Sequence, residues 1–111
     1  MLASCFKTAD ELGLNPSQRD ALIKVLGMLE RGELHEIEPV GDYIHDSRIN
    51  PTAFSMRCWA TCICGHASRF AEFNSMDRSQ GGPTGALFYR TGMSMAQATM
   101  ALRDYLTTGR A

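Results

Sequence analysis

The chain has 111 residues, a length that suits one folded unit, and we expect residues 1–111 to form a single domain. Apolar residues make up 44% of the sequence and charged residues 21%, an ordinary balance for a globular protein that excludes a wholly disordered chain. The formal net charge is −1, so composition provides no general attraction to nucleic acid or to an anionic membrane surface. We expect neither as a direct partner.

The clearest predicted helix covers residues 16–31. Asn15 can cap its free backbone N–H groups, and Pro16 suits the first helical position. Gly32 is typical of the position just after a helix. Apolar side chains recur at helical spacing and predict one stripe that faces a core: Leu22, Val25, Leu26 and Leu29.

Two capping boxes predict further helix starts. Thr8 with Glu11 predicts one short helical turn, and Ser94 with Gln97 predicts a helix over residues 95–108. In a capping box the first side chain accepts from a free backbone N–H group, and the second side chain accepts from the amide of the cap residue. The helix over 95–108 has an apolar face made of Ala98, Ala101, Leu102, Tyr105 and Leu106.

The middle of the chain divides into a long connection and a third helix. Between Glu33 and Ser55 the periodicity lapses, which predicts an irregular connection with a short strand or turn at Tyr43–Ile44. Ser55 can cap a helix over about 56–73, with Trp59, Ile63, His66, Ala67 and Phe70 on its buried side. The predicted fold is therefore mostly α, a compact bundle of three main helices, about 16–31, 56–73 and 95–108.

Four residues that suit metal or nucleophilic chemistry lie close together, and we call them the sulfur–imidazole cluster: Cys58, Cys62, Cys64 and His66. On a helix Cys64 is rotated by about 200° from Cys62, which opposes one shared metal ion. His66 lies one helical turn after Cys62, but no oxyanion donor or third orienting group is recognisable. We expect packed core residues, with no metal, no cofactor and no enzyme activity. A small metal or thiol protein is the alternative.

Negative charge concentrates between the first two predicted helices. We call residues 33–55 the acidic connection, which carries Glu33, Glu36, Glu38, Asp42 and Asp46. Carboxylates on a surface can imitate the phosphates of nucleic acid and occupy a basic groove. These five residues are the candidate partner-binding site, and an ordinary solvated loop is the alternative. His35 and His45 lie among them without a recognised metal motif.

The residues from Thr8 to Arg19 also read as a weak helix-turn-helix pattern. The following helix offers Gln18, Arg19 and Lys24 for contact with DNA. Only seven residues precede this pattern, so a supporting first helix is missing, and the acidic connection adjoins the proposed recognition helix. DNA binding is therefore a second alternative.

The cysteines and the N-terminal residues predict a soluble cytoplasmic protein. Cys62 and Cys64 are too close in sequence for an ordinary structural disulfide, which favours reduced thiols. The first residues lack the apolar stretch of a signal peptide, and no segment approaches the roughly 20 apolar residues that span a bilayer.

Phe54-Ser-Met56-Arg-Cys-Trp59, followed by Cys62-Ile-Cys-Gly-His-Ala67, resembles small proteins of phages and prophages that have no assigned activity. The likeness extends over residues 16–109, from the predicted first helix to the closing helix. The resemblance implies that the protein comes from a phage or prophage. It implies no reaction, since no catalytic residue of these proteins can be assigned to this sequence. Small phage proteins of this kind commonly bind and block a host macromolecule, as anti-CRISPR inhibitors do. The sequence thus predicts a non-enzymatic inhibitor in the host cytoplasm that binds a host or viral protein, such as a nucleic-acid-handling defence complex.

Overall fold

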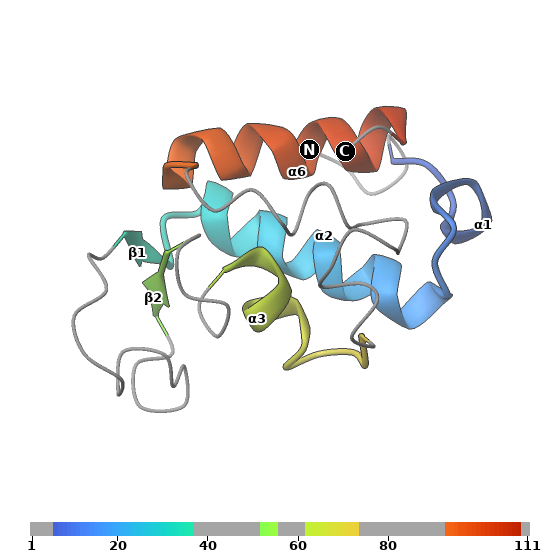
Figure 1. Cartoon of the computed structure of the whole chain (residues 1–111), viewed down its shortest axis with the longest axis horizontal. Coiled ribbons are helices and arrows are strands. Elements are labelled where there is room, and N and C mark those ends of the chain that lie inside the picture. Colours follow the sequence, from blue (N-terminus) through green and yellow to red (C-terminus); the bar gives the residue numbers. More distant parts are fainter. Residues whose placement is uncertain (1–5, 37–51, 56–61, 74–92, 110–111) are drawn as a thin grey trace.

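Two long helices run side by side in opposite directions and carry most of the core. They are α2 (Pro16–Glu30) and α6 (Met95–Thr108), and a computed structural model of the chain shows them along its length (Figure 1). The structure describes residues 6–36, 52–55, 62–73 and 93–109. Both helices begin where the sequence predicts, because Asn15 and Ser94 each form a capping box.

The short helix α1 (Ala9–Leu12) is also set by local chemistry. The Thr8 amide donates to Glu11 Oε1 over 2.9 Å, and the Glu11 amide donates to Thr8 Oγ1 over 3.2 Å. Gly13 ends α1 in the left-handed region at φ +72°, which favours glycine. The predicted helical turn at this position is confirmed.

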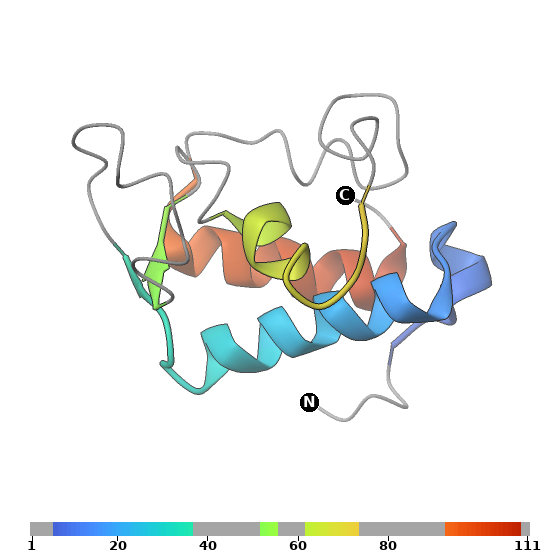
Figure 2. The same ribbon diagram turned by 90° about the horizontal axis from the view of Figure 1, so that it is seen from below.

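Two strands of two residues each pair at the end of the molecule where α2 ends and α6 begins (Figure 2). They are β1 (His35–Glu36) and β2 (Ala53–Phe54), and they run parallel with His35 opposite Ala53. The His35 amide donates to the Thr52 carbonyl oxygen over 2.7 Å. The sequence predicts a strand or turn only at Tyr43–Ile44, which lies outside the described residues. Both observed strands belong to the acidic connection, one near each end.

The predicted helix over 56–73 is wrong in its described part. Its only helical residues there belong to α3 (Ile63–Ala67). Cys62 has an extended backbone, and Ser68–Phe73 follow as turns and coil, while Ser55 follows β2. Residues 56–61 lie outside the described part.

Burial explains why the helical pattern misled over this segment. Four of the five α3 residues are buried, so α3 has no polar face that would reveal its period. Phe70, predicted to be buried, is 42% exposed. Periodicity cannot separate a short, fully buried helix from other buried segments.

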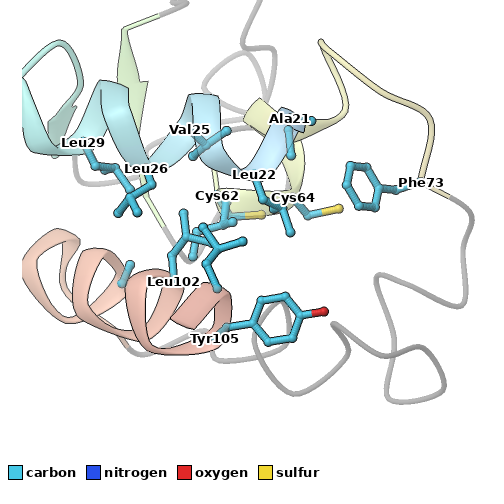
Figure 3. Packing of buried hydrophobic residues seen from close by; sticks show 14 of the residues in the cluster. Ala21, Leu22, Val25, Leu26, Leu29, Cys62, Cys64, Phe73, Leu102 and Tyr105 are labelled. Atoms are coloured by element: carbon cyan, nitrogen blue, oxygen red, sulfur yellow. The ribbon is translucent and has the colours of Figure 1, made fainter. Parts of the chain in front are cut away.

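The core fills the space between α2, α3 and α6. Figure 3 shows Leu22 and Leu26 of α2 facing Leu102 of α6, with the Cys62 and Cys64 side chains beside them. The two predicted stripes are confirmed, with Ala101 at their partly buried edge. The largest fully buried side chains are Tyr105, Phe54, Leu22, Leu26, Leu34, Ile63, Leu102, Leu106, His66 and Val25. The fold is mostly α, as predicted, and its radius of gyration is 12.8 Å, near the roughly 13 Å of a compact chain of this length.

Polar contacts fix α6 against the first half of the chain. The Tyr105 hydroxyl donates to the Leu12 carbonyl oxygen over 3.0 Å in a buried position. Arg103 Nε donates to Glu30 Oε2 over 3.0 Å and so connects α6 to the end of α2. None of the described helices is long and apolar enough to cross a membrane.

Candidate functional site

The described members of the sulfur–imidazole cluster lie in the core, around the start of α3. Cys62 directly precedes α3, and Cys64 and His66 are within it. Their exposed fractions are 3%, 2% and 0%. Cys58 lies outside the described residues. The three described side chains therefore contribute to packing, as the sequence predicts.

Both ring nitrogens of His66 have a polar neighbour. Nε2 lies 2.7 Å from the Ala53 carbonyl oxygen, and Nδ1 lies 3.5 Å from Arg69 Nη1. The imidazole also stacks on the Phe54 ring, with 6.1 Å between the ring centroids and 10° between the planes. His66 thus connects α3 to both residues of β2.

The cysteine environment disfavours the thiolate. Burial raises the pKa of the Cys62 thiol to about 11, so this thiol is protonated at neutral pH. A nucleophilic or metal-binding cysteine needs the reverse shift, since the thiolate is the reactive form. Within the described residues, no group of three or more His, Cys, Asp or Glu side chains is placed to hold a metal ion.

Two of the five predicted partner-binding acids lie in the described part, and both make contacts within the protein. Glu33 forms an exposed ion pair with Arg31. Glu36 Oε2 accepts a hydrogen bond of 2.7 Å from the Met95 amide at the first residue of α6. A carboxylate is favoured there because the free N–H groups give a helix start partial positive charge. Glu36 therefore connects β1 to the start of α6 by a hydrogen bond.

The other three predicted acids, Glu38, Asp42 and Asp46, lie outside the described residues, as does His45. They fall between β1 and β2 in the sequence. β1 and β2, which precede and follow this segment, lie together at the end of the helical core where α2 ends and α6 begins (Figure 1). The strand pair therefore fixes residues 35–36 and 53–54 of the acidic connection to each other.

The three side chains of the helix-turn-helix hypothesis also have partners in the protein. Gln18 Nε2 donates to the Glu72 carbonyl oxygen over 3.0 Å, and Arg19 Nε donates to the Lys7 carbonyl oxygen over 2.7 Å. The Lys24 ammonium lies 4.9 Å above the centre of the Phe70 ring, a cation–π distance. These contacts connect α2 to the segment before α1 and to the segment after α3.

Sequence reasoning missed three groups around His66: the Ala53 carbonyl, the Phe54 ring and Arg69. Arg69 follows His66 by three residues, a spacing that places two side chains side by side on one helical turn and could have suggested their contact. Ala53 and Phe54 carry no such signal, because they precede His66 by 13 and 12 residues, far beyond the three- or four-residue spacing of one helical turn.

Two open hollows lie elsewhere on the described surface. One of about 310 Å³ is lined by Thr8, Ala9, Pro16, Arg19 and Asp20. Another of about 330 Å³ is lined by Met93, Gln97, Met100, Ala101 and Asp104. Neither is lined by a predicted site residue of the sulfur–imidazole cluster or of the acidic connection.

Comparisons with known protein families, with curated proteins and with solved structures found no match for this chain. The resemblance to phage and prophage proteins stays a prediction.

Proposed function

We propose that this protein is a non-enzymatic binding protein and that its acidic connection contacts a basic surface on a protein partner. The observation that supports this most directly is the pairing of β1 with β2, which joins the two flanks of the segment that carries Glu38, Asp42 and Asp46 and places these flanks beside the helical core. Loops that carry binding residues on a rigid scaffold are a common arrangement in recognition.

The anchors of this loop divide the five acids into two roles. Glu36 holds β1 to the start of α6, and Glu33 pairs with Arg31, so these two residues position the base of the connection. Glu38, Asp42 and Asp46 are the residues we assign to the partner. Their carboxylates suit a groove that otherwise holds nucleic-acid phosphates.

Such a partner fits the setting implied by the phage and prophage resemblance. A protein that covers the basic groove of a nucleic-acid-handling defence complex would act as an inhibitor without a reaction of its own. The described cysteines and His66 are not assigned to the partner, because burial and contacts within the core already occupy them.

The test is a pull-down from host lysate with three forms of the protein, followed by mass spectrometry. The first form is wild type, and the second carries Glu38→Gln, Asp42→Asn and Asp46→Asn. The third carries the same charge change at three exposed sites on the helices: Asp10→Asn, Asp20→Asn and Asp104→Asn.

We expect one partner to be retained by wild type and by the helix variant, lost by the connection variant, and released as salt is raised. Equal retention by the connection variant contradicts the proposed role of the acidic connection. Retention that is lost equally in both variants points to net charge rather than to this segment, and also contradicts it.

A further inference from the structure

His66 occupies the junction between the helical core and the strand pair. Its ring is fully buried, its Nε2 faces the Ala53 carbonyl oxygen, and its plane stacks on Phe54. Ala53 and Phe54 are the whole of β2, and the His66 side chain contacts both of them; Phe54 also packs in the apolar core. The strand partner of β2 is β1, which makes His66 a link between α3 and the closed end of the acidic connection.

The contacts of His66 define one protonation state. A carbonyl oxygen can only accept, so Nε2 carries the hydrogen and donates to Ala53. In a neutral imidazole the other nitrogen is then an acceptor, and Arg69 Nη1, which can only donate, faces it at 3.5 Å. The site thus satisfies one donor and one acceptor, which is the full capacity of a neutral ring.

A second proton would break this match. It would bind to Nδ1 and point at the Arg69 guanidinium. Nδ1 would then be a donor facing another donor, and the positively charged imidazolium would face the positively charged guanidinium. Burial lowers the pKa of His66 below its ordinary value; the Ala53 carbonyl opposes this shift, and the charge of Arg69 adds to it.

Within the described part of the chain, no acidic group acts on the ring to offset the extra proton. Among the described residues, Arg69 is the charged group that acts on His66. β2 contributes an uncharged carbonyl and a phenyl ring, and the side chains that α2 buries are all apolar. On α6 the titratable buried group is Tyr105, whose hydroxyl is engaged with Leu12.

We propose that His66 is a pH-sensitive lock between α3 and β2: when its ring takes up a proton, β2 is released from α3 and the β1–β2 pair opens. The strand pair is only two residues long, so it has little pairing of its own to hold it closed. The Tyr105 and Arg103 contacts, which hold α6 to α1 and to α2, do not involve β2. This lock is a property of the fold and needs no partner.

The sign of the effect follows from the lowered pKa of His66. The closed state binds the proton more weakly than the open state, so the closed state is fully favoured above the ordinary pKa of about 6.5. As the pH falls below that value, the open-to-closed ratio rises by up to about tenfold per pH unit, until the pKa of the closed state is reached.

The test is NMR-detected hydrogen exchange from about pH 7.5 to about pH 4.5, with protection factors corrected for intrinsic exchange. The amide of residue 35, which donates to Thr52, reports the strand pair, and the Leu102 amide within α6 reports the core. We expect protection at residue 35 to fall with pH by up to about tenfold per unit, while protection at Leu102 stays constant. Constant protection at residue 35, or a parallel fall at Leu102, overturns the proposal.

Three variants separate His66 from other titrating groups. His66→Gln keeps a donor and an acceptor but does not titrate, so it should remove the pH dependence at residue 35. His35→Gln removes an exposed histidine of the strand pair and should leave that dependence intact. Arg69→Gln removes the facing charge and so raises the pKa of His66 in the closed state; the fall in protection should therefore end at a higher pH and be smaller in total. If His66→Gln does not fold, the Arg69→Gln variant decides: a fall in protection of unchanged size, or one abolished by His35→Gln, overturns the lock.

Discussion

Tyr105 shows how one buried polar atom can connect distant parts of a small protein. Its ring is 1% exposed, and its hydroxyl donates to the carbonyl oxygen of Leu12 at the end of α1. We predict that Tyr105→Phe lowers the free energy of unfolding by about 1 kcal/mol, because the Leu12 carbonyl loses this donor while the ring packing is kept. Urea unfolding measures the change. Met100→Leu, an exposed change on the same helix, is the control, and an equal effect of the two substitutions would contradict the role of the hydroxyl.

The buried thiols make a second prediction at the residue scale. In the folded protein, Cys62 should react with iodoacetamide near pH 8 about 100-fold more slowly than an ordinary cysteine from its raised pKa alone. Its burial slows the reaction further, and the buried Cys64 should also resist labelling. Peptide mass spectrometry follows each site, with the urea-unfolded chain as the reference. Labelling of Cys62 at the unfolded rate would show that the start of α3 is not packed as described.

At the scale of elements, two glycines near the C-terminal end of α2 should respond in opposite ways to substitution by alanine. Gly32 follows α2 at φ +71° with open space where a Cβ would lie, so Gly32→Ala should cost about 1 kcal/mol from backbone strain alone. Gly27 lies inside α2, where a Cβ would meet only the end of the exposed Arg31 side chain. Gly27→Ala should therefore be neutral or stabilise by up to about 1 kcal/mol, because alanine has the higher helix propensity. Thermal unfolding of both variants measures this, and the reverse order would contradict the described end of α2.

The same elements show which structural information is local in sequence. The capping boxes at Thr8 and Ser94 were predictable, since each depends on two side chains three residues apart and on no other part of the chain. The α2 stripe was predictable because one face of this helix is polar and exposed. Neither condition holds for α3, which is buried almost all round and is positioned by β2.

The strand pair and the surroundings of His66 were beyond sequence reasoning for a physical reason. A strand of two residues is too short to show a periodic pattern of apolar residues. Its pairing also joins residues that are 18 positions apart in the sequence, such as His35 and Ala53. The burial of His66 was predicted, but its stacking on Phe54 was not, because no local rule places these rings together. The structural use of Glu36 was also missed, since its partner is the start of a helix 59 residues away.

On the scale of the whole molecule, the fold separates a packed helical core from a charged connection fixed to one end of it. α2 and α6 supply the core, and β1, β2 and the Glu36 contact hold the two ends of the connection (Figure 2). Cys62, Cys64 and His66 are enclosed in the core, while five of the twelve acidic residues belong to the connection. This separation is the basis for assigning recognition to the connection.

The most direct test of that assignment is the affinity of the purified partner at two salt concentrations for wild type, the connection variant and the helix variant. If each of the three carboxylates contributes about 0.5–1 kcal/mol, the connection variant should bind more weakly by about 1.5–3 kcal/mol and lose most of its salt dependence. The helix variant should match wild type. Unchanged affinity and salt dependence in the connection variant would contradict the account, and the acidic connection would then be only a solvated loop.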